Sequence, residues 1–410
     1  MKILAIASSY PYAGFPFSGI FNEKCVKALQ QLCDYIEVLA PRPYVPGFLA
    51  VTPRWKLYSR IAGFEDRNGI SINRPPVFQI PGIGGSFWYD RGAYLACSGH
   101  AKKMHGRVNF DAIVSFDLLG AGGLAWQIGR DLGIPACGWA FGSDVRVSVS
   151  SSDGRSVART LRNLDLIFYQ SAELRRKAAQ LLDGSAGEMQ QEKHVVLPHG
   201  IPVPATFPGP ESRKAMRKSW GVTEDSLVVL SVGRITGQKG SYDLLEAAAH
   251  ALSLNRSMTF LLVGSMPAFD ETEMVLKRIA ADAQLKNNVL ILPPCSPYEI
   301  WDVLCGADIF AFASHNEGMP NSLLEAMAAG LPAVAFDIPA VQELDGGTSS
   351  LSVIESFDAG HFGREIADLA ASRDKRIHAG EKGRKRVQQQ FRIEKNMAEA
   401  LAKIEKLVHR

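Results

Sequence analysis

The sequence predicts an α/β protein with two doubly wound, Rossmann-like domains, each built on a parallel sheet. The chain has 410 residues, whereas one domain usually takes about 100–200. Short runs rich in Val, Ile and Leu alternate with helical patterns, as in sheets covered by helices. A proline-rich segment near the middle interrupts this alternation, and the pattern then begins again, which indicates a second domain.

The first domain is expected over residues 1–200. Its buried strands are predicted at residues 2–7, 35–40, 112–115, 136–139, 166–169 and 195–197, with helices at 20–33 and 122–132. The segment from Pro198 to Pro210 holds five prolines. Because proline fixes φ and lacks an amide donor, this segment is expected to connect the two domains.

The second domain is expected over residues 201–385. Its strands are predicted at residues 227–232, 259–263, 289–292, 309–313 and 333–336, with helices at 242–252, 271–284, 298–305 and 321–329. Residues 386–410 are predicted to form a C-terminal helix that packs back on the first domain. Its apolar stripe consists of Ile393, Met397, Leu401, Ile404 and Val408. We expect the two sheets to face each other across a cleft, because ligands bind beyond the carboxyl ends of parallel strands.

Composition excludes a disordered or collagen-like chain. The hydrophobic fraction is 46%, the charged fraction 21% and the net charge +3, which is ordinary for a globular protein and gives no argument for nucleic acid as a partner. The first half of the chain is the more basic, which favours it for an anionic partner, although so small an excess can equally carry no meaning. Six cysteines without a CxxC pair suggest reduced thiols. Without a signal-peptide pattern or a long apolar run, we expect a cytoplasmic protein.

Several motifs that carry chemistry are absent from the sequence. No GxGxxG follows the first strand, no Walker A motif is present, and no GxSxG marks a nucleophilic serine. There is no DxD pair to hold a divalent ion, and the nine histidines show no metal-ligand spacing. We therefore expect an enzyme that needs no metal and no cofactor.

A basic loop follows the first strand of the second domain. Gly233 allows a sharp turn after Val232, and Arg234 and Lys239 lie in the same glycine-rich loop before a helix. Arginine binds phosphate oxygens bidentately and lysine acts as a point charge, so this loop suits a diphosphate. A solvated basic loop without function is the equally weighted alternative from spacing alone.

An acidic pair brackets the start of the helix at 321–329. Glu317 lies in the loop before this helix and Glu325 within it; Pro320 suits the first helical position and Gly330 the stop. The unsatisfied N–H groups at such a helix start favour a negative ligand, and the carboxylates suit sugar hydroxyls. The plain alternative is one capping acid and one surface acid.

Together these strings resemble a known family. EGMPNSLLEAMAAGLPAVA resembles the E-x7-E signature of the retaining family 4 glycosyltransferases, which have the GT-B fold, and VGRITGQKG resembles that family's diphosphate-binding loop. KILAIASSYPYAGFPFSGIF is similar to the family's opening strand and glycine loop, and LPHGI to the strand end before its linker. The resemblance covers most of the chain.

The resemblance implies that the second domain holds a nucleotide-diphosphate sugar, a UDP- or GDP-sugar. Arg234 and Lys239 would neutralise the leaving diphosphate, Glu317 would contact the donor sugar and Glu325 the ribose; Arg234, Lys239 and Glu317 are the expected catalytic residues. The full set of expected donor-binding residues is Gly19, Gly233, Arg234, Lys239, Leu292, Pro293, Glu317, Gly318, Met319, Pro320, Asn321, Ser322, Leu323 and Glu325.

The first domain is expected to bind the acceptor, a saccharide or a lipid-linked saccharide in bacterial cell-surface polysaccharide or glycolipid synthesis. Asp117 and Asp144 are the candidate acceptor residues, although Phe141 stands where the family commonly has histidine. Residues 41–91 mix arginine and aromatic residues, which suits sugars or an anionic membrane surface and equally an irregular region packed by its own aromatics. A peripheral position at the inner face of the membrane is a further hypothesis.

Two other functions fit the same two-domain frame. One is a nucleotide-sugar epimerase or hydrolase, which would consume the donor without any acceptor. The other is a non-catalytic subunit that binds a nucleotide sugar. All four charged positions of the two motifs are intact, which favours an enzyme over a binding subunit.

Overall fold

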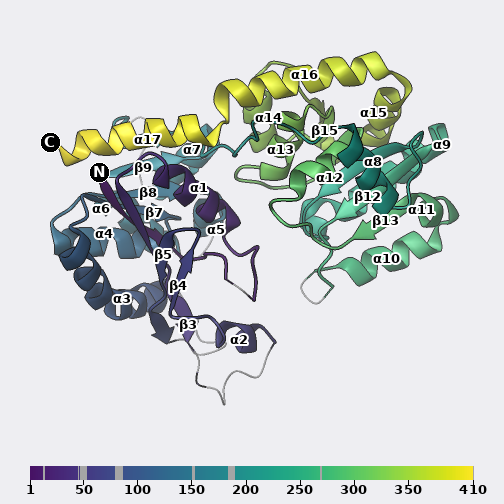
Figure 1. Ribbon diagram of the computed structural model, residues 1–410. Coiled ribbons are helices and arrows are strands. Elements are labelled where there is room, and N and C mark those ends of the chain that lie inside the picture. The colour runs from purple at the N-terminus through teal and green to yellow at the C-terminus, as the bar shows by residue number, and fades with distance from the viewer. Residues whose placement is uncertain are drawn as a thin grey trace. The chain divides into compact units, whose positions relative to one another are not determined.

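The computed structural model describes residues 1–12, 14–44, 46, 53–78, 86–149, 153–182, 190–267 and 270–409. It divides into two compact units, of which one comprises Met1–His199 and Ile393–Arg410 and the other Gly200–Arg392. Each unit is an α/β domain with helices on both faces of a sheet (Figure 1). The two Rossmann-like domains predicted from the sequence are therefore present.

The first unit contains an eight-stranded sheet with the order β10-β9-β8-β7-β1-β2-β5-β4, in which only the β4–β5 pair is antiparallel. Its strands are β1 Lys2–Ala7, β2 Tyr35–Leu39, β4 Phe64–Arg67, β5 Ile70–Asn73, β7 Ala112–Phe116, β8 Ala136–Ala140, β9 Leu166–Tyr169 and β10 His194–Val196; β3 Arg42–Tyr44 and β6 Pro76–Phe78 form a separate pair. Every predicted strand of this domain is present within two residues of its expected bounds, and the β3–β6 region was not predicted.

Helices cover both faces of this sheet. They are α1 Ile20–Gln30, α2 Pro53–Tyr58, α3 Ser86–Val108, α4 Ala121–Leu132, α5 Ser143–Val149, α6 Gly154–Asn163, α7 Ala172–Gln180 and α17 Ile393–Val408. One apolar core lies between the sheet and α1 and α17, and a second lies on the face covered by α3, α4, α6 and α7. Much of the segment 41–91, including residues 47–52 and 79–85, lies outside the described residues.

The second unit contains a six-stranded, fully parallel sheet with the order β13-β12-β11-β14-β15-β16. Its strands are β11 Leu227–Val232, β12 Met258–Val263, β13 Val289–Leu292, β14 Ile309–Phe312, β15 Ala333–Phe336 and β16 Ser352–Ile354; its helices are α8 Pro210–Ser219, α9 Ser241–Leu254, α10 Thr272–Ala281, α11 Ala283–Asn288, α12 Ile300–Gly306, α13 Asn321–Ala329, α14 Pro339–Asp345, α15 Ala359–Ala371 and α16 Arg373–Gln390. The helix predicted at 271–284 is two helices, because the Asp282 carboxylate caps α11 by accepting the Gln284 and Leu285 N–H groups at 2.8 and 3.1 Å.

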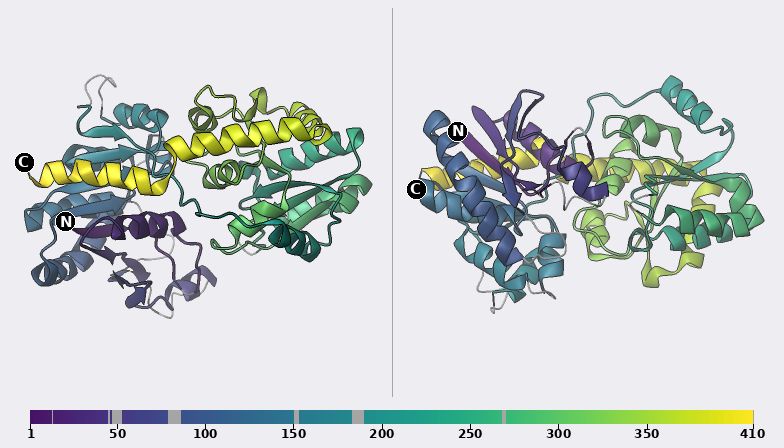
Figure 2. Two further views of the ribbon diagram at one scale, coloured as in Figure 1. Left: turned by 45° about the horizontal axis from the view of Figure 1, so that its top comes forward. Right: turned by 90° about the horizontal axis from the view of Figure 1, so that it is seen from below.

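The C-terminal region differs from the single helix predicted from residue 386. The chain leaves helical geometry after Gln390: Ile201 N–H donates to Phe391 O at 2.8 Å, and Ile201 forms a parallel bridge with Arg392. α16 therefore belongs to the second unit, and only α17 belongs to the first, so the boundary lies at residue 393. α17 lies beside α1 (Figure 2). Four residues of the predicted apolar stripe are buried in the core of this unit: Ile393, Met397, Leu401 and Ile404.

Candidate functional site

The basic loop begins where β11 ends at Val232. Gly233 N–H donates to Val263 O at 2.9 Å, and the loop then closes in a 3-10 turn, Gly237–Lys239. The Thr236 hydroxyl caps this turn by accepting the Lys239 N–H at 3.3 Å. Arg234 is exposed, and no carboxylate among the described residues pairs with it. The loop therefore presents one cation without a protein counter-ion.

At Gly240 this loop packs against the segment that follows the neighbouring strand, β14. β11 and β14 are parallel neighbours, so their carboxyl ends lie side by side. Gly240 has φ of +70°, and a Cβ added to it would lie 1.8 Å from Ala313 O, in the segment after β14. Glycine is needed here both for the left-handed backbone and for the close approach of the two loops.

The E-x7-E segment starts after β14 and leads into α13. The helix begins at Asn321, as predicted, but Pro320 is the residue before its first turn rather than the first helical residue, and it accepts Leu324 N–H at 3.0 Å. The N-cap residue, Pro320, makes no side-chain hydrogen bond to the first turn of α13, and N–H groups at such a helix start can bind an anion. Gly330 ends the helix with φ of 81°.

The structure places the three expected catalytic side chains on adjoining loops. Lys239 Nζ donates a hydrogen bond to Glu317 Oε1, and the Ser314 hydroxyl donates to the same oxygen at 3.0 Å. Only 28% of the Lys239 side chain and 14% of the Glu317 side chain are exposed. Glu325 lies inside α13 and is 6% exposed. The sequence did not indicate the Lys239–Glu317 ion pair, because it depends on β11 and β14 being neighbours.

The other expected donor residues of this unit lie at the same edge of the sheet. Gly318, Met319 and Pro320 lie in the loop between Glu317 and α13, and Asn321, Ser322 and Leu323 form the first turn of α13. Leu292 ends β13, and its carbonyl oxygen accepts the Gly264 and Ser265 N–H groups, each at 3.1 Å. The interpretation that Leu292 and Pro293 contact a base through their backbone stays a prediction.

α16 holds the far end of α13 in place. The Arg384 guanidinium donates to Ala329 O at 2.7 Å and Ala328 O at 3.3 Å, which are carbonyls left open at the end of that helix. The same group lies 5.2 Å from the centre of the Phe207 ring. α13, whose first turn holds expected donor-binding residues, is thus fixed at its last turn by a cation.

Gly19, the expected donor residue of the first unit, precedes α1. It has φ of 62°, and an added Cβ would lie 2.3 Å from Ser9 O. The chain's own backbone therefore requires glycine at this position. The interpretation that Gly19 allows close approach of a diphosphate stays a prediction.

The two candidate acceptor carboxylates bind loop amides. Asp144 accepts the N–H groups of Leu118, Phe141, Gly142 and Val145 at 3.0, 3.3, 2.8 and 3.0 Å. Asp117 accepts the N–H groups of Ser8 and Ala121 at 3.3 and 3.0 Å. Burial raises the pKa of Asp144 and raises that of Asp117 well above its usual range. These contacts fix the loops after β1, β7 and β8, and contact with an acceptor stays a prediction for both residues.

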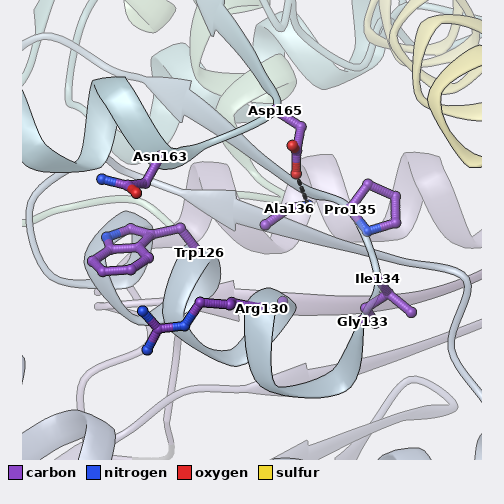
Figure 3. A pocket seen from close by; sticks show the side chains of 9 residues that line it. Trp126, Arg130, Gly133, Ile134, Pro135, Ala136, Asn163 and Asp165 are labelled. Carbon is purple, nitrogen blue, oxygen red and sulfur yellow. Dashed lines mark hydrogen bonds between the residues drawn. The ribbon is translucent and has the colours of Figure 1, made fainter.

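A hollow of about 400 Å³ lies at the opposite, amino-terminal edge of the first unit's sheet, where β8 and β9 begin. Figure 3 shows Trp126 and Arg130 of α4 on one side and Asp165 on the other. The Arg130 guanidinium lies 5.4 Å from the Trp126 ring centre, and Asp165 accepts Ala136 N–H at 2.8 Å. None of the expected site residues lines this hollow.

Within the described ranges, no group of three or more His, Cys, Asp and Glu side chains could hold a metal ion. No helix among the described residues is long and apolar enough to cross a membrane. In the segment 41–91, Trp55 and Tyr58 pack edge to face with ring centres 5.6 Å apart, as expected for aromatics that pack on one another.

Comparison with known proteins finds similar glycosyltransferases. Residues 212–386 match the family model described as glycosyl transferases group 1, which spans the basic loop and both glutamates. The putative teichuronic acid biosynthesis glycosyltransferase TuaC of Bacillus subtilis is 29% identical over 84% of this chain and 83% of its own length. An Escherichia coli UDP-Gal:α-D-GlcNAc-diphosphoundecaprenol α-1,3-galactosyltransferase is 28% identical over 40% of this chain and 42% of its own.

Solved structures share the fold over the whole chain. Anabaena HepE in complex with UDP-glucose superposes with a TM-score of 0.72, covering 98% of this chain and 99% of that one at 19% identity. Such low identity establishes the fold alone, which is the GT-B arrangement of two Rossmann-like domains. With the family match over residues 212–386 and the relatives, this fold supports a glycosyltransferase of family 4, whose members have the GT-B fold.

Proposed function

We propose that this glycosyltransferase moves a sugar from a UDP- or GDP-sugar to a saccharide or lipid-linked acceptor, with retention of configuration and without a metal ion. One observation carries the proposal. At the carboxyl edge of the second sheet lie Arg234, which pairs with no carboxylate among the described residues, the Lys239–Glu317 pair and the first turn of α13, which its N-cap residue does not cap. This combination of fixed cations and open amides suits a diphosphate attached to a sugar.

The chemistry fits these groups. Breaking the anomeric bond leaves positive charge on the sugar and negative charge on the diphosphate. Arg234, Lys239 and the α13 amides stabilise the developing anion. The loss of one such hydrogen-bond donor typically lowers the rate about 10²–10³-fold. Glu317 contacts the donor sugar, and Glu325 accepts hydrogen bonds from the ribose. The leaving phosphate takes the acceptor's proton on the face it leaves, so no protein base is required.

Before donor binds, Glu317 provides the counter-charge for Lys239. Both side chains are half-buried or deeper, where an unpaired charge is costly, so the ion pair stabilises the empty site. A bound diphosphate supplies new negative charge to Lys239, so that Glu317 can also accept hydrogen bonds from sugar hydroxyls. The same two residues therefore serve the empty and the occupied site.

The acceptor side of the proposal is supported by the relatives. TuaC is named for teichuronic acid synthesis, and the Escherichia coli relative acts on a diphosphoundecaprenol-linked sugar. By analogy, the first domain binds a growing polysaccharide or a lipid-linked sugar at the cytoplasmic face of the membrane, with Asp117 and Asp144 near the acceptor. Flotation with anionic vesicles at moderate salt tests the membrane contact, and no co-migration of the protein would contradict it.

Donor turnover measured with a panel of UDP- and GDP-sugars tests the proposal. Arg234→Ala is expected to lower transfer at least a hundredfold, in line with the loss of one hydrogen-bond donor to the transition state. Glu317→Ala is expected to lower transfer as well, because it removes the contact to the donor sugar and the counter-charge of Lys239. Arg256→Ala is the matched control, because Arg256 is also exposed but precedes β12 at the other edge of the sheet. Unchanged turnover in both site variants would contradict the site. Full consumption of donor without acceptor would indicate an epimerase or hydrolase instead.

A further inference from the structure

A histidine outside the expected donor site joins the two loops that carry Lys239 and Glu317. His315 follows β14 by three residues. Its N–H donates to Gln238 O at 3.1 Å, and its Nε2 lies 2.9 Å from Asp243 Oδ2 in the first turn of α9. His315, in the loop that leads from β14 to Glu317, thus contacts the chain on both sides of Lys239.

Two aromatic side chains hold the imidazole of His315. The Phe357 ring stacks on it, with centres 4.8 Å apart and planes 16° apart. The Phe336 ring meets it edge to face at 5.9 Å and is itself fully buried in β15. The imidazole is therefore fixed by a carboxylate, by the face of one ring and by the edge of another.

The backbone beneath Phe357 is strained. Ser356 and Phe357 have φ of +59° and +52°, a left-handed conformation that residues other than glycine rarely adopt. Phe357 is also 41% exposed, so burial of its side chain does not explain this geometry. Strained positions of this kind persist where the surrounding contacts hold them, often at functional sites. Here the strain brings the ring onto His315.

We propose that His315 is a positioning residue that sets the arrangement of Lys239 and Glu317, and so of the charges that receive the diphosphate. This inference rests on the proposed function. Lys239 has a long, flexible side chain, and catalysis by such a charge depends on its placement to within about 1 Å. The backbone at the base of this side chain is held by three contacts between the two loops. They are the His315 contacts to Gln238 and Asp243 and the close approach of Gly240 to Ala313.

Affinity for UDP and GDP, measured calorimetrically, tests the inference together with kcat and KM for transfer. His315→Ala is expected to weaken binding of the nucleotide that wild type prefers about five- to tenfold, the usual effect of one polar contact. His315→Gln keeps an amide that can donate to Asp243 and is expected to recover most of the loss. His378→Ala, an exposed histidine of α16, is the matched control and is expected to behave as wild type.

The decisive comparison uses a Lys239→Ala background. If His315 acts through Lys239, His315→Ala lowers nucleotide affinity by less than a further twofold in the Lys239→Ala protein. If the two residues act independently, His315→Ala causes the same fold-loss of affinity in Lys239→Ala as in wild type. Equal fold-losses in both backgrounds, or wild-type affinity and turnover in His315→Ala, would overturn the inference while leaving the proposed function intact. A wild-type protein that binds neither nucleotide and transfers no sugar contradicts the proposed function itself. Circular dichroism of both His315 variants verifies that they are folded.

Discussion

Replacing Gly240 by alanine tests how the two loops of the donor site are joined. Two costs follow from the structure. At φ of +70° an L-residue costs about 1–2 kcal/mol relative to glycine. The added methyl would also lie 1.8 Å from Ala313 O, so one loop has to move, and such overpacking typically costs about 1–3 kcal/mol. We therefore expect Gly240→Ala to lower the free energy of unfolding of the second unit by about 2–5 kcal/mol.

Gly221→Ala is the matched control. Gly221 lies in the same unit with φ of +69°, but nothing lies within 4 Å of its added Cβ, so it tests the backbone cost alone. The lower entropy of the unfolded chain with alanine affects both variants equally and cancels in the difference. Urea unfolding followed by hydrogen exchange of peptides from residues 200–392 gives both values. Equal losses of stability in the two variants would refute the close approach of Gly240 to Ala313.

Three further predictions concern single side chains. His194, which is buried 2.9 Å from the Tyr169 hydroxyl, has its pKa lowered by burial from 6.5 to about 4. The unfolded chain therefore binds this proton at a higher pH than the folded chain does. The free energy of unfolding is expected to fall by up to about 3 kcal/mol as the pH drops from 6.5 to 4, and His194→Gln should flatten that part of a pH series of urea midpoints. Asp144→Ala leaves four loop amides without their acceptor, and we expect it to lower the free energy of unfolding of the first unit by about 3 kcal/mol, measured by calorimetry. The affinity for UDP or GDP should not change, and a change would place Asp144 in the donor site. Lys239→Met removes one donor to the leaving group and is expected to lower kcat about 10²–10³-fold with the fold intact, whereas a tenfold effect or less would assign Lys239 to ground-state binding alone.

The elements that carry the site could be predicted from local sequence. The helix predicted at 321–329 is α13, because Pro320 and Gly330 mark both of its ends. The loop with Arg234 and Lys239 follows β11 as expected, because a buried apolar run ends at a glycine. These signals lie within a few residues of the feature that they predict.

The parts that the sequence did not predict depend on contacts between distant residues. The Lys239–Glu317 pair and the contact of Gly240 with Ala313 require β11 and β14 to be neighbours, and strand order is not encoded in local periodicity. The separation of α16 from α17 depends on Ile201 pairing with the chain at Phe391 and Arg392. For Asp144, acceptor contact stays a prediction, and the sequence did not indicate that its oxygens bind backbone amides, because only the folded loops bring these amides together.

Hydrogen exchange with and without bound UDP or GDP tests the central claim, that the donor's diphosphate binds at the carboxyl edge of the second sheet. We expect slower exchange in residues 234–240 and 317–325, where the basic loop and the first turn of α13 receive the ligand. Slower exchange confined to other segments, with these two unchanged at saturating nucleotide, would contradict it.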